Sequence, residues 1–101
     1  MIGLIVTADD RLYMVLTSRV EAEGYTPTRA RDVLEGLEYA TTCSVGMIFI
    51  DMSLHAADTL LETLHARQAT RNIPFFAVKS GGRLPLELRR LCTGVLEAGA
   101  L

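Results

Sequence analysis

Short apolar runs alternate with amphipathic segments along the chain. Strands are predicted where a run is apolar or extended in character, over residues 3–7, 25–30, 45–50 and 73–78. Helices are predicted where apolar residues recur every three or four positions, over residues 10–23, 32–42, 58–69 and 84–95. This alternation is typical of a parallel sheet that has right-handed crossovers and carries helices on both faces.

Two of the predicted strands indicate their own place in the sheet. The run over residues 45–50, VGMIFI, is the most apolar in the chain and ends abruptly at Asp51, which favours a central, buried strand. Residues 25–30 are interrupted by Pro27. Because proline has no N–H to donate to a neighbouring strand, this second run indicates a sheet edge.

The second predicted helix, over residues 32–42, has a recognisable start and an expected inner face. Asp32 is a residue type that caps the free N–H groups of a first helical turn. The apolar residues expected to face the sheet are Val33, Leu34, Leu37 and Ala40.

Composition and charge restrict the class of protein. The 101 residues suit one domain, over residues 1–101, and a packed core is feasible because 50% of them are hydrophobic. A net charge of −2 gives no electrostatic reason to expect nucleic acid as a partner. Cys43 and Cys92 follow no metal-ligand spacing, and the start MIGLIV resembles neither a signal peptide nor a membrane span. These features favour a cytoplasmic protein that does not enter a membrane.

The polar residues that follow the predicted strands are the candidates for chemistry. In open α/β sheets, ligands bind at the carboxyl ends of the strands, near the point where the strand order reverses. Residues 7–10, 51–53 and 79–80 take these places in the sequence. We therefore expect these three segments to meet at one edge of the sheet.

Four segments carry a resemblance to a known family. The stretch from Val6 to EAEGY, the segments MIFIDMSL and ATRNIPFFAV, and the closing LEAGA resemble, in order and spacing, the receiver domain of bacterial response regulators. The resemblance covers nearly the whole chain and suggests a degenerate member of this CheY-like superfamily. It implies a flavodoxin-like, doubly wound parallel sheet with strand order 2-1-3-4-5, which we expect here shortened to about four strands and four helices.

The resemblance assigns a role to the residue that ends the central strand. Asp51 takes the phosphoacceptor position, where a carboxylate attacks a phosphoryl group held by a divalent cation. The backbone carbonyl of Ser53 would then help to coordinate Mg²⁺. We expect Mg²⁺ as a cofactor only if Asp51 is active.

The loop after the first strand departs from the family pattern. Receivers carry an acidic pair there to hold Mg²⁺, but Thr7 and Ala8 occupy those places in this chain. Asp9 follows and is the candidate replacement ligand, because hard cations need oxygen donors. The alternative is that Asp9 and Asp10 form a solvated helix start, with Asp10 as the cap.

A second departure lies after the fourth predicted strand. The family's threonine or serine switch residue is replaced by Lys79, with Ser80 next to it. Because strands three and four are neighbours in the receiver order, Lys79 is predicted to reach Asp51 and to favour a locked, unphosphorylated state. The alternative is that Lys79 extends into solvent, as flexible exposed lysines do.

The third departure is at the C-terminal end. With residues 84–95 predicted as a helix, the sequence ends at Leu101 without the family's fifth strand, its lysine or its fifth helix. The strand over residues 73–78 would then be an apolar sheet edge, which proteins normally cover or blunt. We therefore expect a homodimer or a protein partner that covers this edge.

These departures favour a pseudo-receiver, which is a non-enzymatic signalling module that works by protein–protein interaction without standard aspartyl phosphorylation. One alternative is an atypical receiver, phosphorylated on Asp51 in a two-component phosphorelay with Asp9 as a metal ligand. Another, of a different class, is a small nucleotide- or flavin-binding domain. The two carboxylates after the first strand disfavour it, because they would repel phosphate.

Overall fold

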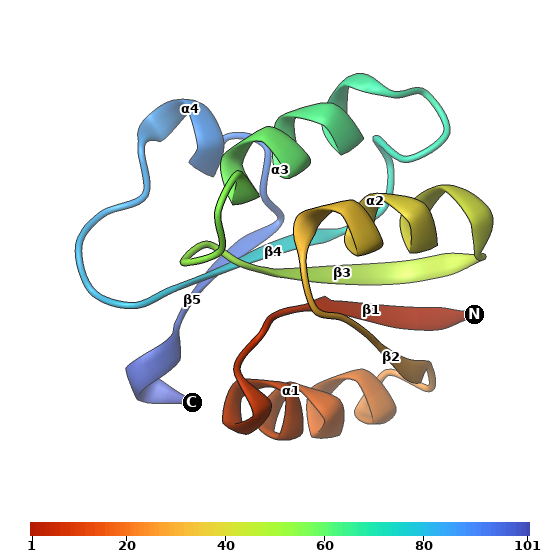
Figure 1. Cartoon of the computed structure of the whole chain (residues 1–101), viewed down its shortest axis with the longest axis horizontal. Helices are drawn as coiled ribbons and strands as arrows, with labels where there is room; N and C mark the ends of the chain where they lie inside the picture. Colours follow the sequence, from red (N-terminus) through yellow and green to blue (C-terminus); the bar gives the residue numbers. More distant parts are fainter.

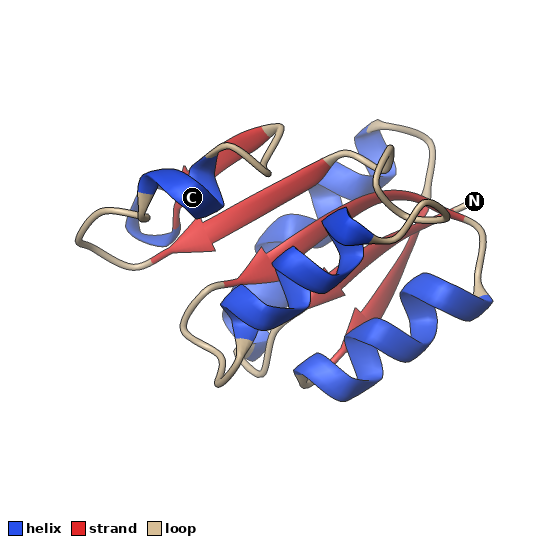
Figure 2. Cartoon of the chain, turned by 90° about the horizontal axis from the view of Figure 1, so that it is seen from above, coloured by secondary structure: helices blue, strands red, loops and turns tan.

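Five parallel strands form one sheet in the computed structural model, which describes residues 1–101 (Figure 1). The sheet order is β2-β1-β3-β4-β5, and every pair of neighbours runs parallel, so the strands point in a common direction (Figure 2). The strands are β1 (Ile2–Val6), β2 (Thr26–Ala30), β3 (Val45–Asp51), β4 (Phe75–Lys79) and β5 (Gly94–Glu97). The doubly wound, flavodoxin-like fold expected from the sequence is confirmed, with five strands in place of four.

Helices cover both faces of this sheet, as the alternating pattern predicts (Figure 1). One face carries α1 (Asp10–Ala22), and the other carries α2 (Val33–Thr42), α3 (Ala57–Ala66) and the short α4 (Leu86–Arg89). A single 3-10 turn, η1 (Ala98–Ala100), follows β5 on the α1 side. None of the helices combines the length and apolar character needed to cross a membrane.

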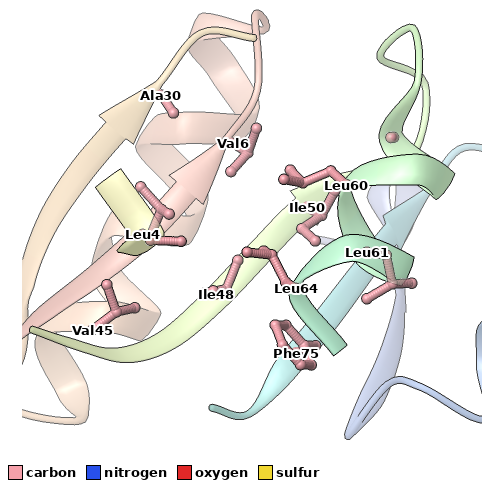
Figure 3. Close-up of a cluster of buried hydrophobic side chains, with 12 residues drawn as sticks. Leu4, Val6, Ala30, Val45, Ile48, Ile50, Leu60, Leu61, Leu64 and Phe75 are labelled. Atoms are coloured by element: carbon pink, nitrogen blue, oxygen red, sulfur yellow. The ribbon is translucent and has the colours of Figure 1, made fainter. Parts of the chain in front are cut away.

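The central strand β3 supplies side chains to two separate cores. Ile48 and Ile50 point to the α2–α3 side, where they meet Leu60 and Leu64 of α3 and Phe75 of β4 (Figure 3). All five of these side chains are at most 2% exposed. Alternate residues of a strand face opposite sides of a sheet, so the residues between them are directed to the α1 side.

The smaller core lies between the sheet and α1. Phe49 of β3 packs there with Leu12, Leu16 and Val20, which recur at helical spacing along α1. The Phe49 ring stacks on Phe76 of β4, with ring centroids 5.1 Å apart. Together the two cores fix β3 at the centre of the sheet, which places its last residue, Asp51, beside the ends of β1 and β4.

The end of the chain differs from the sequence prediction. The predicted helix over residues 84–95 is limited to the four residues of α4, and Val95 lies in β5. Strand β5 pairs along β4 from Phe76↔Gly94 to Lys79↔Glu97, so a fifth strand is present. The expectation that residues 73–78 form an uncovered edge was wrong, and with it the reason for a homodimer at that edge.

Two local predictions had different outcomes. The Asp32 side chain caps α2 by accepting a hydrogen bond from the backbone N–H of Glu35 at 2.8 Å, as predicted. Leu34, however, is 79% exposed and does not face the sheet. Gly36 and Ala40 are the buried residues of α2, so fewer residues of this helix face the sheet than the sequence predicts.

Strand β2, which contains Pro27, lies at a sheet edge as expected.

Candidate functional site

The carboxylate of Asp51 is buried at the carboxyl end of the sheet. The residue is only 6% exposed, and β3 holds it level with Val78 of β4. On the other side, β1 ends at Val6 beside Ile50, so Thr7 follows directly next to Asp51. The loops after β1, β3 and β4 therefore meet here, as the sequence predicts.

Both oxygens of the Asp51 carboxylate accept hydrogen bonds from the protein. The Thr7 hydroxyl donates to Oδ2 at 2.7 Å, and this threonine is fully buried. The Ser53 hydroxyl donates to Oδ1 at 2.6 Å, and the Ser53 backbone N–H donates to the same oxygen at 3.0 Å. These three donors offset the cost of burying a carboxylate away from water.

Asp9, rather than Asp10, caps the first helix. Asp9 Oδ1 accepts from the backbone N–H groups of Arg11 at 2.9 Å and Leu12 at 3.2 Å. Asp10 instead pairs with Arg29 at 2.7 Å, and the hydrogen bond and charge of that guanidinium lower the pKa of Asp10. The alternative that assigned the cap to Asp10 was therefore wrong.

Lys79 does not reach Asp51. Its Nζ donates to Glu97 Oε2 at 2.5 Å and to the Gly82 carbonyl at 2.8 Å. The backbone N–H of Gly81 donates to the second Glu97 oxygen at 2.8 Å. The hydrogen bond from Lys79 is the main reason that the pKa of Glu97 is lowered. The prediction that Lys79 pairs with Asp51 was wrong. Strand β5 places Glu97 directly beside Lys79 in the sheet register, and Lys79 pairs with this residue instead.

A small cavity brings most of the predicted site residues together. Its volume is about 310 Å³, and its lining includes Asp9, Asp51, Ser53 and Ser80. Lys79 lines a neighbouring cavity of about 370 Å³, which also touches Ser53 and Ser80. The structure thus gathers the predicted residues at one place, but it gives Lys79 a different partner.

The side chains around this cavity do not fit a divalent cation held by several carboxylates. No group of three Asp, Glu, His or Cys side chains is placed to bind one ion. Asp9 Oδ1 is engaged in capping α1, and both oxygens of Asp51 accept protein hydrogen bonds. The polar side chains at the cavity are two carboxylates, both already hydrogen-bonded, and two serine hydroxyls, whereas magnesium sites in proteins use free carboxylates and retained waters.

Solved structures with a similar backbone include several receiver domains. The receiver domain (CheY-like) from Methylobacillus flagellatus aligns with a TM-score of 0.81 at 22% identity, over 94% of this chain and 83% of that one. The N-terminal domain of a response regulator receiver protein from Methanoculleus marisnigri aligns with a TM-score of 0.77 at 21% identity, over 94% and 81%. Chemotaxis protein CheY4 of Vibrio cholerae aligns with a TM-score of 0.76 at 16% identity, over 94% and 83%.

The chain has the receiver fold. This confirms, at the level of the fold, the resemblance seen in the sequence. No family model and no curated protein matches the chain. The roles of Asp51 as the phosphoacceptor position and of Asp9, Ser53, Lys79 and Ser80 around it therefore stay predictions.

Sequence reasoning missed two contributors to this version of the receiver fold. The sequence pattern indicates Thr7 only as a replacement for an acidic residue, although its position directly after β1 is the signal that it lies next to Asp51. Glu97 has no predicted role, because its position depends on a fifth strand that the sequence pattern does not predict.

The Thr7 hydroxyl is expected to stabilise the fold through Asp51. Replacing Thr7 with Val keeps the shape but leaves Asp51 Oδ2 without its donor, which should lower the free energy of unfolding by about 1–3 kcal/mol. Urea denaturation of the two proteins measures this difference. The variant Thr7→Ser, which keeps the hydroxyl, should lose less, and equal stability of the valine and serine variants would contradict the account.

The Lys79–Glu97 pair should make stability depend on acid pH. The folded-state pKa of Glu97 is below its unfolded value, so its ionised form stabilises the fold above the unfolded pKa. This contribution is lost as the pH falls through the folded-state pKa. Glu97→Gln should therefore lower Tm at about pH 7, and its difference from the wild type should shrink towards about pH 3.

Thermal unfolding followed by circular dichroism over this range measures that effect. Glu87→Gln is the matched control, because Glu87 is an exposed glutamate of α4 that makes no ion pair. The Tm difference between Glu87→Gln and the wild type should not change between about pH 7 and about pH 3. A Tm difference for Glu97→Gln that stays constant with pH would contradict the assigned role of the pair.

Proposed function

We propose that the chain is a pseudo-receiver, a signalling module that acts through protein–protein contacts and not through standard aspartyl phosphorylation. The observation that carries the proposal is that protein donors engage both oxygens of Asp51. Thr7 and Ser53 hold both carboxylate oxygens at 2.6–3.0 Å. The fold supports a place in signalling, since the aligned structures are response regulator receiver domains and a chemotaxis protein.

Attack on a phosphoryl group makes demands that this site meets poorly. A carboxylate nucleophile is weakened when hydrogen bonds stabilise its charge, and the charge of the phosphoryl group needs a cation to offset it. The Thr7 hydroxyl occupies one oxygen of Asp51, and Ser53 occupies the other. The nearby cation, Lys79, is engaged by Glu97. A stable, hydrogen-bonded Asp51 is therefore better suited to holding the loops than to reacting.

One observation favours the second candidate, an atypical receiver that accepts phosphoryl on Asp51. Asp9 and Asp51 line the same cavity, so Asp9 is close to the place where a metal ligand is needed. Asp9 could offer a metal only Oδ2 without losing its cap on α1, because Oδ1 accepts the two capping hydrogen bonds, and losing a cap costs about 0.5–2 kcal/mol. We therefore rank this candidate second.

A phosphodonor experiment separates the two candidates. The chain is incubated with acetyl phosphate, with and without Mg²⁺, and its intact mass is measured. We expect no added phosphoryl group, because the Asp51 oxygens are already hydrogen-bonded. The variant Asp51→Asn serves as the control for labelling elsewhere. A Mg²⁺-dependent gain of one phosphoryl group in the wild type, absent from Asp51→Asn, would overturn the proposed function.

A further inference from the structure

Charge is strongly segregated along this chain. Residues 32–66 contain no Lys or Arg, and their acidic residues are Asp32, Glu35, Glu38, Asp51, Asp58 and Glu62. Residues 67–101 contain only two acidic residues, and their basic residues are Arg67, Arg71, Lys79, Arg83, Arg89 and Arg90. The first segment includes α2 and α3, whereas the second includes α4. The helix layer on this face of the sheet therefore has an acidic and a basic part.

The acidic part contains an apolar groove between α2 and α3. The groove has a volume of about 530 Å³, and its walls include Leu34, Leu37 and Leu60. Leu34 is 79% exposed, which is the highest value among the large hydrophobic residues of the chain. Asp32 lies at the groove, and both helices carry glutamates without any compensating lysine or arginine. The groove thus suits an apolar side chain that is accompanied by positive charge.

The basic part presents such a side chain on α4. Leu86 is 59% exposed, and it lies with Arg83 and Arg89 around one open hollow of about 630 Å³. Neither arginine makes an ion pair within the chain. An exposed leucine between two free arginines is the chemical complement of the α2–α3 groove.

The arrangement of the helices prevents one molecule from joining its own two surfaces. Figure 1 shows α3 between α2 and α4 in one layer. The groove lies on the α2 side of α3, and α4 lies on the other side. The complementary surfaces can therefore meet only between two molecules.

We propose that this chain associates head to tail with a second copy of itself, with Leu86 of one molecule seated in the α2–α3 groove of the other. Arg83 and Arg89 then lie near Asp32, the acidic residue that lines the groove. The contact is heterologous, so each molecule retains one free surface of each kind and further copies can add. The proposal adds a partner to the interaction module, but it depends on these two surfaces alone and not on the state of Asp51.

Two variants test the proposal because each removes one surface and keeps the other. Leu34→Ser damages the groove, and Leu86→Ser damages the α4 surface; both leucines are exposed, so the fold should be retained. Molar mass is measured by light scattering and sedimentation from about 10 µM to about 1 mM. We expect the mass of the wild type to rise with concentration beyond that of a dimer, and each variant alone to remain monomeric.

Mixing the two variants gives the sharpest result. The Leu34→Ser protein keeps an intact α4 surface, and the Leu86→Ser protein keeps an intact groove. Their mixture should therefore form dimers and nothing larger. Raising the salt concentration should weaken this association by about tenfold or more, because exposed opposite charges are screened.

Met14→Ser is the matched control, since Met14 of α1 is 72% exposed but belongs to neither surface. It should associate like the wild type, and circular dichroism verifies that all three variants are folded. A wild type that stays monomeric at every concentration would overturn the proposal and leave the groove to a different protein. Association that survives either leucine substitution, or that the mixture fails to restore, would also overturn it.

Discussion

A buried carboxylate at the end of the central strand is the constraint around which this site is organised. Asp51 is carried into the interior by the apolar strand β3, and burial of a charge is costly unless hydrogen bonds compensate it. Thr7 from the end of β1 and Ser53 from the following loop provide that compensation. The Thr7 hydroxyl also accepts the backbone N–H of Asp9 at 3.0 Å, so the same network positions the start of α1.

A second polar contact joins the ends of β4 and β5 at the same carboxyl edge of the sheet. Lys79 and Glu97 stand side by side at the ends of β4 and β5, and Glu97 also holds the backbone of Gly81. Gly81 and Gly82 have positive φ angles of 71° and 64°, which glycine adopts readily, so the loop can bend back to this pair. The carboxylate of Asp51 and the ammonium group of Lys79, which a reactive site would leave free, thus have partners within the protein. On the helix layer, by contrast, Leu34, Leu86 and the arginines beside Leu86 remain without partners.

Much of this fold could be predicted because β1, β3, β4 and the first three helices have strong local patterns. Pro27 correctly marked an edge strand, and Asp51 correctly marked the end of the central strand. Leu84, Leu88 and Leu91 have helical spacing, yet α4 has only four residues, and the short β5 depends on hydrogen bonds to distant β4. The spacing of apolar residues along the chain does not show which distant strand a segment will pair with. For the same reason the sequence located the candidate site but missed which side chains hold Asp51 and Lys79.

The most direct test of the closed Asp51 site is a titration of ¹⁵N-labelled protein with Mg²⁺ and beryllofluoride, a phosphoryl mimic, followed by NMR. The backbone amides of Ser53 and Ser80 report on the loops that line the cavity beside Asp51. The account predicts no saturable shift of these amides, because Thr7 and Ser53 already occupy the carboxylate. Saturable shifts that need both additives, and that disappear in Asp51→Asn, would contradict it.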